Sequence, residues 1–351
     1  MDNLMFGSML AVKVSNSTVV VEEQNHPECK DGDVLVRMRT CGLCGSDLEK
    51  VSGQYSMSSG RVGHEPAGEV IEVGNKVKRF VKGDRVFVHH HVSCYSCWYC
   101  THGDYTMCDM FQKSNIDPCG LSQEFLVPEW NVSRGGLLHL PDNISYDEAA
   151  LIEPLACCIR AFNKLAMRHG DNVAIIGAGP TGVMHLLLSE NAGANQLFVI
   201  DINDFRLKFT KSYQNIFTFN PNTTSNIVDR VKELSYGIGV DSTIVATSNP
   251  LAFSQALTLT RRGGRILLFG VPPKDSVLRL NLSSIYSNEL NIISSYGCSE
   301  IETNQALALI SQKSIDIKPL ITHRFNIEQS AEAFRCARNA NGVMKVIITS
   351  L

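Results

Sequence analysis

The chain has 351 residues, of which 44% are hydrophobic and 19% charged, and its formal net charge is −3. This length predicts two domains of roughly 150 residues each, with a sizeable buried core. The charge balance argues against a dedicated nucleic-acid binder. No apolar run approaches the roughly 20 residues of a membrane span, and residues 1–13 lack the pattern of a signal peptide. We therefore expect a cytoplasmic protein with no nucleic-acid and no membrane partner.

The first 150 residues are predicted to form short strands separated by glycine-rich turns. The predicted strands are 34–39, 68–73 and 86–88, and residues 82–85 are a predicted turn. Strands at this spacing are typical of a small barrel or sandwich.

Two glycine-rich fragments carry groups that could bind a metal. They are Cys41-Gly42-Leu43-Cys44-Gly45-Ser46-Asp47 and Gly63-His64-Glu65-Pro66-Ala67-Gly68. A lone histidine in a loop is more often structural. A thiol, an imidazole and a carboxylate in such loops, ahead of a cysteine cluster, favour a metal site.

Three consecutive histidines, 89–91, precede that cluster. In a strand His89 and His91 would share one face and His90 would point to the other. An exposed polar edge explains the run as well as a ligand site does.

Four cysteines follow within fifteen residues, with the spacing C-x2-C-x2-C-x7-C: Cys94, Cys97, Cys100 and Cys108. This spacing allows four thiolates to surround one tetrahedral Zn²⁺ at about 2.3 Å each. Four protein ligands leave no open position, so this zinc is expected to be structural. The chain has twelve cysteines, and the isolated ones are expected to be small buried apolar residues.

The second half contains a strand–loop–helix–strand pattern typical of dinucleotide binding. The apolar run 173–176 leads into Gly177-Ala178-Gly179-Pro180-Thr181-Gly182 and a predicted helix, and a second strand, 197–200, ends at Asp201. The glycines allow the tight turn, the approach of the pyrophosphate and close helix–strand packing. Asp201 would bond the adenosine ribose and repel a 2′-phosphate, so NAD is favoured over NADP, which is not excluded.

The remaining elements continue this alternation. A helix is predicted to start at 147–155. Arg261 to Gly264 are predicted to form a solvated turn rather than a phosphate site. The further predicted elements are strands 242–247, 265–271, 291–296 and 343–348 and helices 302–310 and 330–338.

The pattern Gly63-His64-Glu65-x2-Gly68-x5-Gly74-x2-Val77 resembles the zinc signature of the medium-chain alcohol and polyol dehydrogenases. The loop 42–47 and the cysteine cluster resemble that family's first-ligand loop and structural-zinc lobe, and Ile152-Glu153-Pro154-Leu155 resembles its sorbitol, threonine and glucose dehydrogenase branch. The resemblance implies an α/β protein with a discontinuous GroES-like β-barrel catalytic domain (1–155 and 297–351) and a Rossmann doubly wound NAD-binding domain (156–296).

The resemblance also implies roles for individual residues. Cys44 and His64 match the two usual protein ligands of a catalytic zinc, and the third would be Glu65 or Glu153, which stands in place of a cysteine ligand of other relatives. Ser46 matches the hydroxyl that relays the alcohol proton. Asp47 matches a carboxylate that orients His64. Two zinc ions per chain are therefore expected, one catalytic and one structural.

Further positions match family contacts with the cofactor or the substrate. Arg206 matches a ribose contact, and the nicotinamide side is matched by Phe269, Gly270, Val271, Ser295 and Tyr296. His90, His91 and Glu49 match positions near the substrate, and Glu49 is a hint of a sugar-like substrate.

The sequence thus predicts a zinc-dependent oxidoreductase that transfers a hydride from a secondary alcohol (polyol, sugar or hydroxy-amino acid) to NAD, in a homotetramer or homodimer. One alternative is a zinc-free quinone or enoyl reductase of the same superfamily, which would bind no metal. The other is a non-catalytic zinc-ribbon module attached to a nucleotide-binding regulatory domain, which would bind NAD without turnover.

Overall fold

A computed structural model describes residues 7–53, 61–211, 213 and 215–350. Contacts between Cα atoms divide the chain into two compact units. Unit 1 runs to Ala156 and resumes at Cys298, and unit 2 comprises Cys157–Gly297. Among the described residues, no helix has both the length and the apolar character to cross a membrane.

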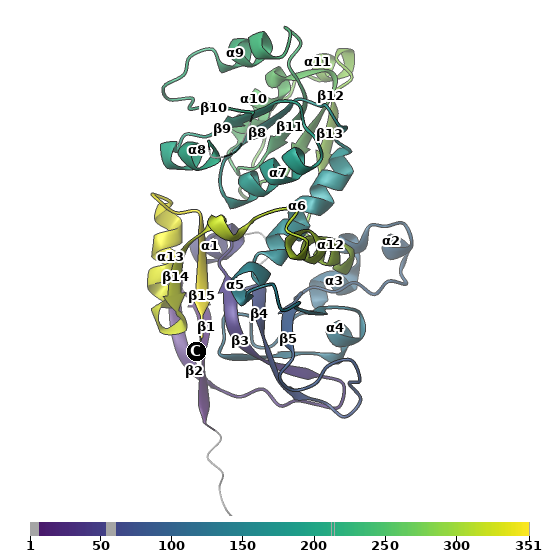
Figure 1. Ribbon diagram of the computed structural model, residues 1–351, viewed down its shortest axis with the longest axis vertical. Coiled ribbons are helices and arrows are strands. Elements are labelled where there is room, and N and C mark those ends of the chain that lie inside the picture. The colour runs from purple at the N-terminus through teal and green to yellow at the C-terminus, as the bar shows by residue number, and fades with distance from the viewer. Residues whose placement is uncertain (1–6, 54–60, 212, 214, 351) are drawn as a thin grey trace, which may run out of the picture. The chain divides into compact units, whose positions relative to one another are not determined.

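Unit 1 is built on a sheet of seven strands (Figure 1). They are β3 (Val34–Gly42), β4 (Glu65–Val73), β5 (Arg85–Val88), β6 (Glu124–Val127), β7 (Leu137–His139), β14 (Ile321–Asn326) and β15 (Lys345–Thr349). The order is β14-β15-β3-β4-β5-β7, and β6 also pairs with β3. A separate antiparallel hairpin is formed by β1 (Ser8–Ser15) and β2 (Thr18–Asn25).

Short helices connect these strands. They are α1 (Gly45–Ser52), α2 (Trp98–Thr101), α3 (Asp109–Lys113), α4 (Glu129–Ser133), α5 (Tyr146–Ala149), α12 (Glu300–Ser311) and α13 (Ser330–Asn339), with 3₁₀ turns η1 (Tyr105–Met107), η2 (Lys318–Leu320) and η3 (Ile327–Gln329). A longer helix, α6 (Ile152–Leu165), begins in unit 1 and continues into unit 2.

The central strand β3 shows why this sequence forms a sheet with a buried face. Val36 and Met38 are fully buried, whereas the alternate Arg37 and Arg39 are partly exposed and pair with carboxylates of neighbouring strands. Successive side chains of a strand point to opposite faces, so this alternation directs the apolar set into one core.

Unit 2 contains a six-stranded parallel sheet with helices on both faces (Figure 1). Its strands are β8 (Val173–Ile176), β9 (Leu197–Ile200), β10 (Ile216–Phe219), β11 (Val240–Val245), β12 (Thr260–Leu268) and β13 (Asn291–Ser294), and its helices are α7 (Pro180–Asn191), α8 (Asp204–Thr210), α9 (Ile227–Leu234), α10 (Pro250–Leu259) and α11 (Leu282–Ser287). The order β10-β9-β8-β11-β12-β13 is that of a doubly wound dinucleotide-binding fold. β8 and β9 are buried along their whole length, as expected for strands covered on both faces.

Three local expectations were wrong. The helix expected from residue 147 is two helices, α5 and α6, separated by a turn. Residues 261–264 belong to β12, where they form an irregularity between the pairs Val240–Thr260 and Ser242–Arg265. The last parallel strand ends at Ser294 rather than at residue 296. The predicted strand 86–88 corresponds to β5, which ends before the histidine run 89–91.

Candidate metal centre and cofactor site

Three predicted metal ligands of unit 1 lie together because of the pairing of two strands. β3 and β4 are antiparallel, and Gly42 at the end of β3 lies opposite Glu65 at the start of β4. This register brings the loop that holds Cys44 beside His64. One potential ligand atom from each of Cys44, His64 and Glu65 lies within 4.8 Å of the others.

Asp47 is fully buried and organises this group. Its Oδ1 lies 3.4 Å from His64 Nδ1 and 3.5 Å from Lys50 Nζ, and it accepts a hydrogen bond from the Gly63 amide at 3.2 Å. Its Oδ2 accepts a hydrogen bond from the Cys44 amide at 3.3 Å. With Nδ1 of His64 directed at Asp47, the ring keeps Nε2 for a ligand, which is the arrangement of a metal-binding histidine.

The electrostatics of this group suit a cation. Burial alone would raise the pKa of Asp47, but His64 and Lys50 outweigh it and lower that pKa below its ordinary value. Burial alone would lower the pKa of His64, but Asp47 and Cys44 raise it well above its ordinary value. The imidazole thus lies in a strongly negative field. A thiolate, an imidazole and a carboxylate form a donor set that fits Zn²⁺.

The two candidate third ligands differ in their surroundings. Both carboxylate oxygens of the buried Glu65 contact Nζ of Lys345, at 2.8 and 2.6 Å, and Lys345 on β15 is only 4% exposed. Burial raises the pKa of Glu65, which Lys345 opposes. Glu153 at the start of α6 is also buried, and its backbone oxygen lies 3.9 Å from Cys298 Sγ. It falls in a separate group of potential ligands from Cys44 and His64.

A small cavity of about 30 Å³ adjoins His64. It is lined by Lys50, Arg61, His90 and His91, whereas Glu49 and Ser46 on α1 are absent from its lining. Burial lowers the pKa of His90 well below its ordinary value and that of His91 to about 4. The neutral His91 ring donates from Nδ1 to the Ser114 carbonyl at 2.6 Å, so its Nε2 is an acceptor.

The four clustered cysteines converge. Cys94 Sγ lies 3.9 Å from Cys100 Sγ, and Cys97 Sγ lies 3.6 Å from Cys100 Sγ. The amide of Cys94 donates to Cys108 Sγ at 3.4 Å. Four thiolates at 2.3 Å from one Zn²⁺ are about 3.8 Å apart, so these sulfurs have the separation of a closed tetrahedral site.

A buried polar cluster that the sequence did not reveal surrounds His89. His89 Nδ1 lies 2.7 Å from Glu300 Oε1, and its Nε2 lies 3.6 Å from Cys298 Sγ. Tyr95, beside the first clustered cysteine, donates a hydrogen bond to the other oxygen of Glu300. Linear spacing offered no signal for residues 298 and 300, which lie more than 200 positions from His89. Linear spacing likewise offered no signal for the pair of Lys345 and Glu65, which lie 280 positions apart.

In unit 2 the glycine motif forms the turn between β8 and α7. Gly177 has φ = 104°, and a Cβ on Gly182 would lie 1.8 Å from the Gly177 carbonyl oxygen. A Cβ on Gly179 would meet nothing nearer than Arg206 Nη1 at 3.5 Å. Space is therefore open above Gly179, at the first turn of α7, where Pro180 is the first helical residue. Such a helix end favours a phosphate.

The predicted adenosine contact lies beside this loop. Asp201 accepts backbone hydrogen bonds from Ala178 at 2.6 Å and Asn203 at 2.8 Å, so its carboxylate is fixed. Among the described residues, neither the buried Nε of Arg206 nor the buried Oγ of Ser295 has a hydrogen-bond partner. These groups fit a polar ligand such as a dinucleotide. Of the other positions expected near the nicotinamide, the Phe269 ring packs edge-on against His185, and Gly270, Val271 and Tyr296 follow strands β12 and β13.

The fold of each unit and these two sites define a dehydrogenase with a metal-binding unit and a dinucleotide-binding unit. Residues 30–141 match the family described as alcohol dehydrogenase GroES-like domain, and residues 180–312 match zinc-binding dehydrogenase. The chain is 30% identical to L-threonine 3-dehydrogenase of Escherichia coli (strain K12), over 92% of this chain and 94% of that protein. It is 29% identical to sorbitol dehydrogenase of Bacillus subtilis (strain 168), over 96% of both.

A solved structure from E. coli CFT073, described as an alcohol dehydrogenase complexed with NADH, superposes with a TM-score of 0.86 at 25% identity, over 98% of this chain and 100% of that one. The chain therefore belongs to the zinc-dependent medium-chain alcohol dehydrogenase family. It is an oxidoreductase that acts on a CH–OH group, and its expected GroES-like and Rossmann fold classes are confirmed.

Proposed function

We propose that the protein oxidises a secondary alcohol of a polyol, a sugar or a hydroxy-amino acid and passes the hydride to NAD. The convergence of Cys44, His64 and a buried carboxylate beside a cavity lined by His90 and His91 carries this proposal. The names of the sorbitol and threonine dehydrogenase relatives support the substrate class.

In this proposal Cys44, His64 and either Glu65 or Glu153 hold the catalytic zinc. A zinc ion bound there would supply a Lewis acid that lowers the pKa of the substrate hydroxyl. Asp47 holds the His64 ring in the tautomer that leaves Nε2 free for binding. Ser46 accepts the hydroxyl proton and passes it to water, so that the alcohol loses one proton and one hydride and becomes a ketone.

His90 and His91 remain neutral in this cavity, so they recognise hydroxyl groups by hydrogen bonds rather than by charge. Glu49, whose pKa is raised by burial, remains a proposed substrate contact. The four-cysteine lobe is proposed to hold a second, structural zinc.

Asp201 favours NAD over NADP because a fixed carboxylate repels a 2′-phosphate. Phe269, Gly270, Val271, Ser295 and Tyr296 are proposed to contact the nicotinamide side, and Arg206 the ribose. We further propose a homotetramer or a homodimer in solution.

Metal analysis and a substrate screen test the proposal together. Purified protein should contain two zinc ions per chain, and NAD reduction should appear with at least one member of a panel of polyols, sugars and L-threonine. Cys44→Ser should lose one zinc and activity, whereas Cys97→Ser should lose the other zinc and should mainly lower stability. Full activity in a metal-free preparation would exclude the zinc assignment, and bound NAD without turnover would favour the regulatory module.

A further inference from the structure

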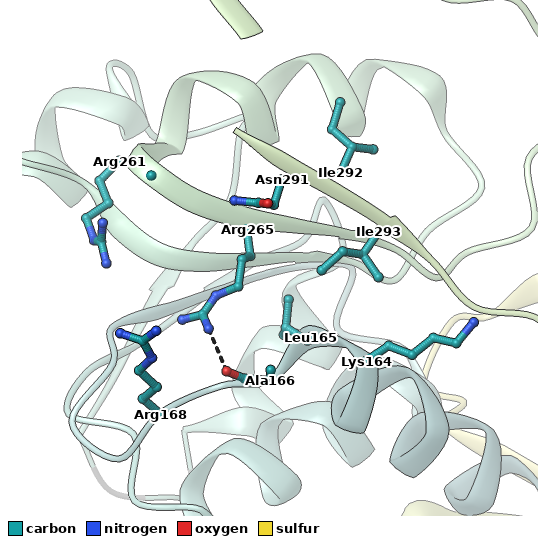
Figure 2. A pocket seen from close by; sticks show the side chains of 10 residues that line it. Lys164, Leu165, Ala166, Arg168, Arg261, Arg265, Asn291, Ile292 and Ile293 are labelled. Atoms are coloured by element: carbon teal, nitrogen blue, oxygen red, sulfur yellow. Dashed lines mark hydrogen bonds between the residues drawn. The ribbon is translucent and has the colours of Figure 1, made fainter. Parts of the chain in front are cut away.

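A cavity of about 310 Å³ opens in unit 2 at the end of α6 (Figure 2). Two of the arginines in its lining already have structural partners. Arg265 bonds the Ala166 carbonyl and Asp171, and Arg261 bonds Asp241. These arginines therefore link neighbouring segments of unit 2. Side chains with the chemistry of a metal site, beyond those already described, lie instead in unit 1 around Cys298.

The thiol of Cys298 and the imidazole of His89 have the separation of two ligands of one metal ion. Cys298 Sγ lies 3.6 Å from His89 Nε2. A sulfur and a nitrogen bound to one tetrahedral Zn²⁺, at about 2.3 and 2.0 Å, are about 3.5 Å apart. Glu153 provides a third donor, because one of its carboxylate oxygens lies within 4.8 Å of Cys298 Sγ. His89 follows β5, Glu153 lies in the first turn of α6 and Cys298 precedes α12, so unit 1 supplies all three.

His89 is held in the orientation of a metal-binding histidine. Its Nδ1 lies 2.7 Å from Glu300 Oε1, and Tyr95 donates a hydrogen bond to the other oxygen of that carboxylate. A carboxylate at Nδ1 fixes the imidazole ring and leaves Nε2, the nitrogen that faces Cys298, to bind an ion. The candidate catalytic zinc site contains the same arrangement of a buried carboxylate beside Nδ1 of a histidine.

The charges around this group of side chains favour a cation. His89, Glu153, Cys298 and Glu300 are all buried. Among the described residues, no lysine or arginine pairs with Glu300, whose ionic partner is His89. A buried carboxylate is costly when its charge is not balanced, and a dication bound beside it would supply that balance. A thiolate, an imidazole and a carboxylate also form a donor set that zinc ions prefer.

We propose that Cys298, His89 and Glu153 bind a further Zn²⁺ ion when zinc is present in excess over the catalytic site and the four-cysteine lobe. This site should be weaker than the lobe, because it has three protein ligands rather than four and because its thiol and imidazole already bond each other. Its occupation would hold Glu153 beside Cys298 and would inhibit the enzyme. That inhibition rests on the proposed role of Glu153 at the catalytic zinc, whereas binding of the further ion does not.

Zinc uptake by the full-length protein tests the site directly. Equilibrium dialysis against a series of free zinc concentrations, with metal analysis of the protein, should show a rise from two to three zinc ions per chain. Cys298→Ser should keep two and should bind the third at least roughly tenfold more weakly. Glu300→Gln can still accept a hydrogen bond from His89 but loses the charge that orients and polarises the ring, so it should weaken the third zinc by roughly 10–100-fold.

The matched control is Cys29→Ser, which removes another thiol of unit 1, one that contacts the backbone oxygens of Lys30 and Asp33. This control should take up the third zinc as the wild type does, and excess zinc should inhibit both proteins but not Cys298→Ser.

Three results would contradict parts of this proposal. Equal uptake by Cys298→Ser and the wild type would mean adventitious surface binding, and a wild type that stops at two zinc ions would also overturn the site. Retention of only one zinc by Cys298→Ser would place Cys298 in the catalytic centre and would overturn a separate site as well. Uptake of the third zinc without inhibition would exclude the competition for Glu153.

Discussion

Replacement of His185 by leucine should stabilise the protein and reduce its sensitivity to acid. His185 lies in the middle of α7, is fully buried and packs edge-on against Phe269 at a ring-centroid distance of 4.6 Å. Among the described residues, neither ring nitrogen has a hydrogen-bond partner. A buried, unsatisfied polar group costs about 1–3 kcal/mol, and leucine fills a similar volume with better helix propensity. His185→Leu should therefore raise the free energy of unfolding at pH 7 by about 1–2 kcal/mol.

The pH dependence provides the more specific test. Burial lowers the pKa of His185 to about 3, whereas an unfolded histidine titrates near 6.5. Between these pH values the unfolded chain binds a proton at His185 that the folded chain does not. The free energy of unfolding is therefore unaffected by this proton above pH 6.5 and decreases as the pH falls below it. Integrated from pH 7 to pH 5, the loss is about 2 kcal/mol.

Urea unfolding of the wild type and His185→Leu at pH 7 and pH 5 measures both effects. The stability difference between variant and wild type should grow by about 2 kcal/mol at the lower pH. His90 and His91, whose pKa values are also lowered, contribute equally to both proteins and cancel. The matched control changes the exposed His169 of the same unit and should keep the wild-type pH dependence. An unchanged difference between pH 7 and pH 5 would refute the reasoning.

Three further changes address the cofactor and metal units. Asp201→Asn removes the negative charge beside the dinucleotide loop, so the ratio of kcat/KM for NADP to that for NAD should rise roughly tenfold or more. His89→Leu leaves the buried Glu300 without its imidazole partner and should lower the free energy of unfolding by about 3–5 kcal/mol in urea titrations. Lys345→Met leaves Glu65 without its ammonium partner and should lower stability by a similar amount, while zinc affinity stays unchanged if Glu65 is not a resting ligand.

Each change has a control of matched size. Asp204→Asn, at the first residue of α8, should leave the NADP to NAD ratio unchanged, and an equal ratio in both variants would contradict the role of Asp201. His89→Gln can still donate to Glu300 and should retain about half of the lost stability, whereas equal losses would mean that packing alone matters. Lys345→Arg should keep the ion pair, and tighter zinc binding in Lys345→Met would identify Glu65 as the resting ligand.

Local motifs determined how far the sequence predicted these sites. The turn from Gly177 to Gly182 and the cysteine spacing are short-range patterns whose geometry depends mainly on neighbouring residues, so the sequence alone predicts both. The alternation of strands and helices after Asn172 predicted the parallel sheet for the same reason.

Contacts between distant segments could not be predicted in this way. Lys345 reaches Glu65 because β15 pairs with β3, and β3 pairs with β4. Glu300, the first residue of α12, lies beside His89, and no local pattern in the sequence indicates this contact. Arg261 was expected in a solvated turn, yet an irregular pairing of β12 with β11 turns it toward Asp241.

The charges around Cys44 favour one reading of the third ligand. Asp47 is balanced by His64 and Lys50, and Glu65 is balanced by Lys345. A dication that took Glu65 would have to share it with an ammonium group 2.6 Å away, in a site where burial makes unbalanced charge costly. Binding through Glu153 would leave the ion pair between Glu65 and Lys345 intact and would add a second ligand charge to that of the Cys44 thiolate. We therefore propose that Glu65 supports the site in its ion pair with Lys345 and could bind the metal only after Lys345 had moved away.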